Sequence, residues 1–180
     1  MAHLHRTIMF ATLALSATAA ERPASCAWQI SESADAMTDE ISYYVHTPGS
    51  TVRMTEYMSY RPELVVKVTP KGTTATGGMK YTGDVMIQIE TDGFDRSQCE
   101  IMTRYNRDKP TAELWQTSTS RHAAFAPDWQ QTISKLSAAT NLTVRYTTTL
   151  GHVRTSTFDV TGLKDALKQV KARHLKQAKK

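Results

Sequence analysis

The chain has 180 residues, of which 40% are hydrophobic and 22% are charged. This balance is that of an ordinary globular protein and excludes a disordered chain, and the length predicts a single domain with one core. The net charge of +5 is concentrated at the C-terminus, because seven basic residues and one acidic residue give residues 164–180 a charge of +6, whereas residues 21–163 carry −2. We therefore expect no nucleic-acid-binding body.

The first twenty residues have the three regions of a secretory signal peptide. A short basic start that contains Arg6 precedes a mostly apolar stretch over residues 7–15 and small residues over 16–20. Cleavage after Ala19 or after Ala20 satisfies the small-x-small rule. The apolar stretch is too short to cross a bilayer, which needs about 20 apolar residues. A membrane anchor or a buried N-terminal helix is the alternative interpretation.

The domain organisation follows from this start. We predict a signal peptide over residues 1–20, a β-rich domain over 21–163, and a basic C-terminal helix or tail over 164–180 that belongs to the same domain. No other stretch is long and apolar enough to cross a membrane. The expected location of the mature protein is the periplasm or the extracellular space.

Two cysteines, Cys26 and Cys99, remain after cleavage. In an oxidising compartment they are expected to pair with each other. A bridge across this span would stabilise the fold by ~4 kcal/mol if its geometry is unstrained. Two free buried thiols and pairing between chains are the alternatives. The spacing fits neither a zinc site nor a C-x-x-C redox motif.

Alternation of apolar and polar residues predicts a series of half-buried strands. Turn residues separate them, among them Thr47–Ser50, Gly72–Gly78 and Asp92–Gly93, and Pro70 is expected to end one of the strands. The pattern predicts a mainly β fold, an antiparallel β-sandwich or barrel-like sheet. The predicted strands cover residues 41–46, 52–57, 64–68, 85–90, 101–105, 142–146 and 157–160.

Two segments have helical periodicity. An internal helix opens at Pro127–Asp128 and ends near Asn141, and an amphipathic C-terminal helix begins near Thr161–Gly162 with Asp165 in its first turn. The lysines of the second helix lie around its polar face. The apolar faces consist of Trp129, Ile133 and Leu136 in the first helix and of Leu163, Ala166, Leu167 and Val170 in the second.

No catalytic motif stands out. Gly72 and Gly78 lack the lysine and hydroxyl residue that complete a phosphate loop, and no serine lies in a G-x-S-x-G elbow. The histidines are scattered, so a zinc site would require the fold to gather His122 and His152 with an acidic residue. Ser118 and Ser120 are interpreted as part of a polar loop or strand edge. The sequence therefore predicts a non-enzymatic protein without cofactor or metal.

The acidic residues give only weak signals. Asp35, Asp39 and Glu40 form a cluster that lacks the pattern of a calcium loop, so a helix cap or a solvated turn is the favoured interpretation. A carboxylate pair for sugar hydrolysis drawn from Asp95, Asp108 and Glu113 is the weakest of these signals, because any domain of this size has such residues by chance.

The basic C-terminal segment is the most unusual composition in the chain. Such a helix face binds anionic lipid headgroups, an acidic partner protein or nucleic acid in other settings. The alternative is a solvated face whose last turns fray, and the thinning of the apolar face after Leu175 favours it. The residues we assign to partner binding are Lys164, Lys168, Lys171, Arg173 and Lys176.

Several segments occur in an order that resembles a known family. Arg104–Asp108, Leu114–Ser120 and Ala124–Phe125 are similar to a stretch of the VasI/TagO family, which comprises type VI secretion-associated proteins of the bacterial envelope, and Phe158–Leu163 is the most specific match. Further matching segments are Trp28–Ile30, Ser33–Glu40, Arg61–Lys67, Ile133–Leu136, Leu142–Tyr146 and Ala166–Leu167.

The resemblance covers nearly all of the mature chain and implies an exported β-rich accessory protein without a known catalytic centre. Trp115, Phe125 and Phe158 would then fill the core, and Gly162 would start the final helix. Two features depart from the family: Lys67 replaces a strand cysteine, and no cysteine ends the last helix. A different disulfide pattern is therefore expected.

The functional prediction is an exported, non-catalytic accessory or binding protein, associated with a type VI secretion apparatus. Its partner would be an envelope or secretion-system protein, with an anionic surface contact through the basic tail and no nucleic acid. The alternatives are an inhibitor or immunity-type protein whose Gly72–Gly78 loop inserts into a target cleft, and a hydrolase of cell-envelope polymers.

Overall fold

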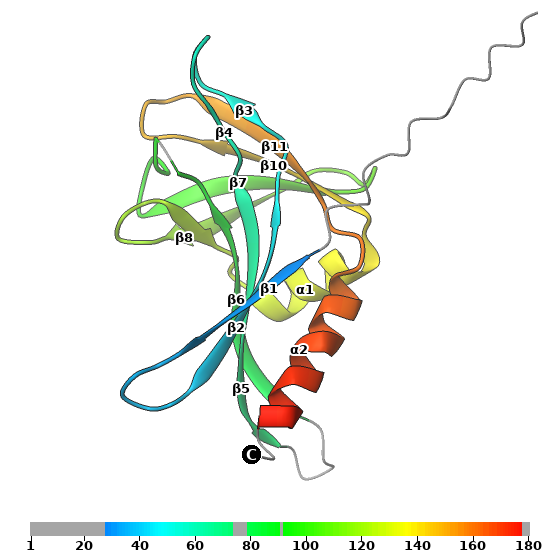
Figure 1. Ribbon diagram of the computed structural model, residues 1–180. Helices are drawn as coiled ribbons and strands as arrows, with labels where there is room; N and C mark the ends of the chain where they lie inside the picture. Colours follow the sequence, from blue (N-terminus) through cyan, green and yellow to red (C-terminus); the bar gives the residue numbers. More distant parts are fainter. Residues whose placement is uncertain (1–27, 74–78, 91, 178–180) are drawn as a thin grey trace, which may run out of the picture.

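The computed structural model describes residues 28–73, 79–90 and 92–177 (Figure 1). In this part of the chain a nine-stranded sheet, a two-stranded hairpin and two helices form the fold. The mainly β prediction is confirmed. The expected signal peptide, Cys26 and residues 74–78 of the glycine-rich turn lie outside the described residues.

The large sheet is antiparallel throughout and runs in the order β1-β2-β5-β6-β9-β8-β7-β10-β11. The short strand β9 joins a first half, β1-β2-β5-β6, to a second half, β8-β7-β10-β11. The sheet curls so that the second half crosses the upper part of the first (Figure 1). The strands thus belong to one continuous sheet, and the two separate sheets of a sandwich are not confirmed. The bounds are β1 Gln29–Ala34, β2 Ile41–Pro48, β5 Glu63–Thr73, β6 Met79–Gln88, β7 Gln98–Tyr105, β8 Thr111–Thr117, β9 Ala123–Phe125, β10 Asn141–Thr147 and β11 Val153–Asp159.

The two halves meet where β2 ends. Gly49 forms an isolated bridge with Phe158 of β11, and the Ser50 N–H donates to the carbonyl of Thr157 at 2.7 Å. A Cβ atom on Gly49 would lie 2.5 Å from Ser156 Oγ and 2.8 Å from a ring carbon of Phe158. Glycine is therefore required here for close backbone approach. The hairpin of β3 (Val52–Arg53) and β4 (Ser59–Tyr60) follows directly.

The core lies between the two halves and under the helices. Alternation sends Leu64, Val66 and Val68 of β5 inward, where all three are buried, whereas Lys67 points to the other face. Trp115, Phe94 and Phe158 are among the largest fully buried side chains, as are Tyr43 and Tyr146. Trp115 and Phe158 thus take the core positions that the resemblance implied, while Phe125 belongs to a smaller cluster.

Both helices cover the inner side of the first half of the sheet below the second half (Figure 1). Helix α1 (Trp129–Ala138) begins after Asp128, whose side chain accepts from the Gln131 N–H at 2.9 Å as an N-cap. Helix α2 (Leu163–Gln177) buries its apolar face in the core, and the Tyr43 hydroxyl donates to Gln177 Oε1 at 2.7 Å. Neither helix is long and apolar enough to span a membrane.

The expectation that Pro70 ends its strand is wrong. Strand β5 continues to Thr73, and Pro70 pairs with Tyr81 of β6. Pro70 lies beyond Val68, where pairing with β2 stops, and next to a register shift relative to β6. Strand ends and bulges are the places where a sheet tolerates a residue without a backbone N–H.

Candidate functional site

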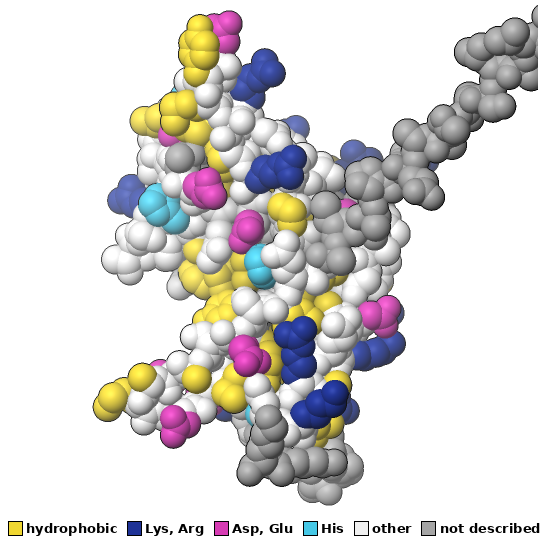
Figure 2. All heavy atoms as spheres, in the orientation of Figure 1, with side chains coloured by type: hydrophobic (Ala, Val, Ile, Leu, Met, Phe, Trp, Pro, Cys, Tyr) yellow, Lys and Arg dark blue, Asp and Glu magenta, His cyan; other side chains and the backbone are white. Residues whose placement is uncertain are grey.

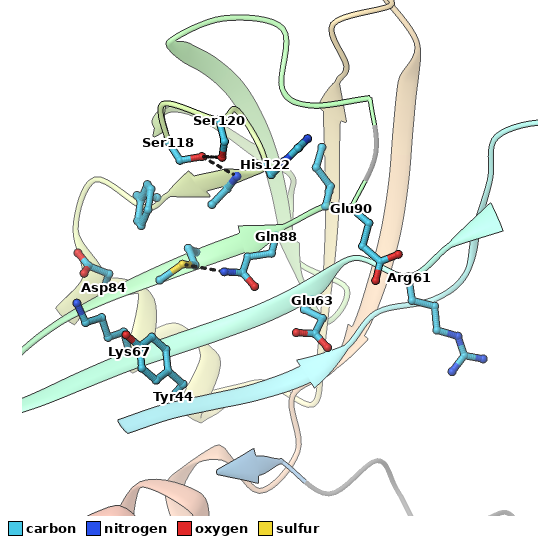
Figure 3. Close-up of a pocket in the computed structure, with 14 residues that line it drawn as sticks. Tyr44, Arg61, Glu63, Lys67, Asp84, Gln88, Glu90, Ser118, Ser120 and His122 are labelled. Atoms are coloured by element: carbon cyan, nitrogen blue, oxygen red, sulfur yellow. Dashed lines mark hydrogen bonds between the residues drawn. The ribbon is translucent and has the colours of Figure 1, made fainter. Parts of the chain in front are cut away.

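A groove of about 650 Å³ lies on the outer face of the first half of the sheet, and we call it the outer-face groove. Its side chains come from β2, β5, β6 and β9 and from the turn between β8 and β9 (Figure 3). Tyr44, Met86, Ala123 and Phe125 give it an apolar floor. The polar and charged side chains around this floor are Arg61, Glu63, Lys67, Asp84, Gln88, Glu90, Ser118, Ser120 and His122.

Strand register creates the charge pattern of this groove. Lys67 of β5 lies opposite Tyr44 on one side and opposite Asp84 on the other, so an aromatic ring, a cation and an anion form a row across three strands (Figure 3). Glu63 is the first residue of β5, and its Oε2 lies 3.5 Å from Nδ1 of His46. Because these groups stand on strands, their positions are set by the sheet.

The serines of the groove hold a turn together. The Ser118 and Ser120 hydroxyl oxygens lie 3.1 Å apart, and Ser118 Oγ accepts from the Ala123 N–H at 3.1 Å. Within the described chain, neither hydroxyl is hydrogen-bonded to a histidine, and the exposed His122 is the histidine that lines this groove. The bonds of Ser118 and Ser120 place both hydroxyls within the turn between β8 and β9, which fits the interpretation of the two serines as part of a polar loop.

The other polar candidates are dispersed. Among residues 28–73, 79–90 and 92–177, no three His, Cys, Asp or Glu side chains are placed to hold a metal ion. His152 contacts Arg154, with 3.3 Å between Nδ1 and Nη2. Asp35 accepts from the N–H groups of Met37 and Thr38 at 2.9 Å each, and these bonds lower the pKa of Asp35. Part of the acidic cluster thus stabilises a turn.

A second cavity, of about 410 Å³, lies between α1, α2 and the inner face of β5 and β6. Three of the residues assigned to partner binding, Lys164, Lys168 and Lys171, stand along its edge, so we call it the lysine-rimmed groove. They follow the i, i+4, i+7 spacing of one helix face. Its apolar lining consists of Val68, Tyr81, Trp129, Ile133, Leu167 and Val170.

The structure separates the other two predicted basic residues from this rim. Nη1 of Arg173 lies 3.5 Å from the carbonyl oxygen of Ile30 in β1, on a different side of α2. Lys176 is exposed and does not line the groove. Basic side chains nevertheless gather over α2 in the space-filling view (Figure 2). The predicted face is thus two surfaces, one at the groove and one towards β1.

Cys99 is buried in β7. Burial, and secondarily the charge of Asp95, raises the pKa of the Cys99 thiol to about 11. A group with this pKa is a poor nucleophile at neutral pH. No disulfide is formed within the described chain, and since Cys26 lies outside it, the Cys26–Cys99 bridge stays a prediction.

A buried polar cluster that the sequence did not reveal lies where β4 meets the sheet. The hydroxyl oxygens of Tyr60 and Tyr146 are 2.6 Å apart, and burial raises the pKa of both groups. Nearby, Arg154 Nη2 lies 4.0 Å from Asp92 Oδ2, and Arg154 Nη1 donates to the carbonyl of Arg53 at 3.1 Å. These contacts fix the β3–β4 hairpin to the sheet.

Comparison with protein-family models, with curated proteins and with solved structures found no match to this chain.

Proposed function

We propose that this protein is an exported, non-catalytic binding protein of the bacterial envelope that recognises a partner protein through the outer-face groove. The observation that carries the proposal is a preformed groove in which side chains of both charges surround an apolar floor. The resemblance to the VasI/TagO family suggests a type VI secretion component as the partner.

The composition of the groove supports a protein partner. Protein interfaces combine an apolar, aromatic centre with a polar rim, and Tyr44 and Phe125 supply aromatic surface at the floor. Opposite charges at Lys67 and Asp84 favour a partner segment with the complementary order of charges. Strand-borne side chains lose less conformational freedom on binding than loop residues do.

The proposal is tested by affinity capture of tagged, signal-processed protein from cross-linked envelopes, followed by mass spectrometry. The decisive variant swaps the charges of the groove, Lys67→Glu with Asp84→Lys. The matched control makes the same swap in the exposed turn between β7 and β8, Arg107→Glu with Asp108→Lys. Both variants keep the net charge of the protein unchanged.

Three outcomes are informative. Loss of a captured envelope protein in the groove variant, with retention in the control, is the expected result. Recovery of secretion-apparatus subunits would identify the partner that the resemblance suggests. Equal capture by the original protein and both variants would mean that the outer-face groove is not the binding surface.

A second candidate function, an inhibitor or immunity-type protein, is favoured by the β3–β4 hairpin. Its tip carries Tyr57 and Met58, which are 90% and 52% exposed. Thr55 Oγ1 accepts from the N–H groups of both residues, at 3.3 and 3.0 Å, so the exposed side chains stand on a hydrogen-bonded turn. The test is whether the protein protects bacterial cells from a cell-wall hydrolase. Protection by the original protein that is lost in Tyr57→Ser would favour this function over the first.

A further inference from the structure

The lysine-rimmed groove is open at the surface, yet most of the side chains that line it are apolar. Its floor combines the aliphatic side chains Val68, Ile133, Leu167 and Val170 with the rings of Tyr81 and Trp129. A volume of about 410 Å³ falls in the range of pockets that enclose small molecules. The groove lies on the opposite face of β5 and β6 from the outer-face groove and is a separate site.

The lining favours a hydrocarbon occupant. Apart from the Tyr81 hydroxyl, the Trp129 indole N–H and the three lysine ammonium groups, the side chains around the groove carry no polar atoms. An extended peptide would bring backbone N–H and C=O groups that need hydrogen-bond partners. A hydrocarbon chain brings none and gains from burial against such a surface.

The rim favours an anion at one end of that chain. Lys168 Nζ bonds Asp165 Oδ1 at 2.9 Å, and both groups are so exposed that the pair contributes little. Within the described chain, Lys164 and Lys171 have no acidic group within 4.0 Å of their Nζ atoms. Helix α1 has no acidic residue, and Asp84 of β6 lines the outer-face groove. The local charge is therefore positive.

We propose that the lysine-rimmed groove binds a free medium-chain fatty acid. The hydrocarbon chain lies along the floor between α1 and α2, and the carboxylate is held at the edge by Lys164, Lys168 and Lys171. The apolar floor sets the preference for chain length, and the ammonium groups set the preference for charge.

Binding is measured on the purified mature protein with dodecanoate by calorimetry. Bromine-labelled dodecanoate provides a second signal, because Trp129 lines the groove and bromine quenches indole fluorescence on contact, whereas Trp28 and Trp115 are core residues. Saturable quenching that disappears in Trp129→Phe is expected. Affinity should rise about fourfold for each methylene added from octanoate to dodecanoate, and dodecyltrimethylammonium should bind more weakly than dodecanoate.

Two variants test the two parts of the site. Removing the rim charges, with Lys164, Lys168 and Lys171 all changed to Ser, should weaken dodecanoate binding about tenfold. A control that removes three exposed basic residues outside α2 should leave binding unchanged. Ile133→Asn should weaken binding of both dodecanoate and dodecanol, and circular dichroism verifies that the variant is folded. The control variant carries Lys80→Ser, Arg107→Ser and Lys109→Ser.

Several results would overturn the proposal. Absence of saturable binding up to the solubility of dodecanoate would do so, as would equal affinity in the rim variant and its control. Binding to vesicles of anionic phospholipid without binding of free dodecanoate would assign this face to a membrane surface instead. The Lys67/Asp84 charge swap should not affect dodecanoate, so failure here is distinguishable from failure of the proposed partner binding.

Discussion

Leu163, the first residue of α2, offers a direct test of whether the C-terminal helix is part of the hydrophobic core. Its side chain is 1% exposed and packs in the main core cluster. Leu163→Ala removes three carbon atoms, which corresponds to about 2.4 kcal/mol of transfer free energy at ~0.8 kcal/mol per methylene group, and the cavity raises the loss to roughly 3 kcal/mol. For a domain of this size the melting temperature should fall by roughly 10 °C.

The assay is reversible urea and thermal unfolding of the mature protein, followed by far-ultraviolet circular dichroism. Leu175→Ala is a matched control, because it makes the same chemical change in the same helix at a side chain that is 43% exposed. This control should change the free energy of unfolding by no more than about 0.5 kcal/mol. Similar losses for the two variants, or a loss below about 1 kcal/mol for Leu163→Ala, would refute the packing of α2 as part of the core.

Four further predictions concern other contacts. Gly49→Ala should lower the free energy of unfolding by about 1–3 kcal/mol, because its Cβ has no room against β11; an unchanged urea midpoint would contradict this close approach. Tyr60→Phe should cost about 1–3 kcal/mol, since it leaves the buried Tyr146 hydroxyl without its partner, and the double Phe variant should cost less than the sum of the single variants. Intact mass of the exported protein after alkylation in denaturant without reductant should show no alkyl group if Cys26 and Cys99 are bridged, and two added groups would exclude the bridge. In reduced, folded protein, Cys99 should resist alkylation at pH 8, because burial raises the pKa of its thiol to about 11; alkylation as fast as in the unfolded chain would contradict its burial.

Most strands that the sequence predicted have at least one buried face. The strand expected over residues 52–57 is wrong beyond Arg53, because residues 55–57 bend at the hairpin tip and Tyr57 is exposed. Alternation over residues 41–46 and 142–146 corresponds to β2 and β10, in which every second side chain is buried. Period-two patterns arise because one face of a strand meets the core and the other meets solvent. The internal helix was predictable for a similar reason, because Asp128 is a strong N-cap immediately before an amphipathic segment.

Three strands of the large sheet, β1, β8 and β9, escaped prediction. Strand β1 consists mostly of exposed residues and is held by its backbone pairing with β2. In β8, Trp115 is buried while the neighbouring Leu114 is 63% exposed, which blurs the alternation. Strand β9 has only three residues. Such strands form because neighbouring strands pair with them. The local pattern of apolar and polar residues does not reveal this pairing.

The candidate sites were predictable only in part. Helical spacing places Lys164, Lys168 and Lys171 on one face and Arg173 on another, so the separation seen in the structure was available from a helical wheel. The floor of the lysine-rimmed groove was not predictable, because it combines side chains of β5, β6 and α1 with those of α2. The outer-face groove depends on the register that sets Lys67 opposite Asp84, and register follows from non-local pairing.

The strand pair β5–β6 carries both grooves, one on each face. Consecutive residues serve different sites: Lys67 faces the outer-face groove and Val68 the lysine-rimmed groove. A one-residue slip of β5 against its neighbours would exchange these faces and place a lysine in the core, which strongly penalises any register other than the observed one. The buried side chains of Leu64 and Val66 anchor β5 in the core. The strand pair β5–β6 therefore holds both grooves in fixed positions.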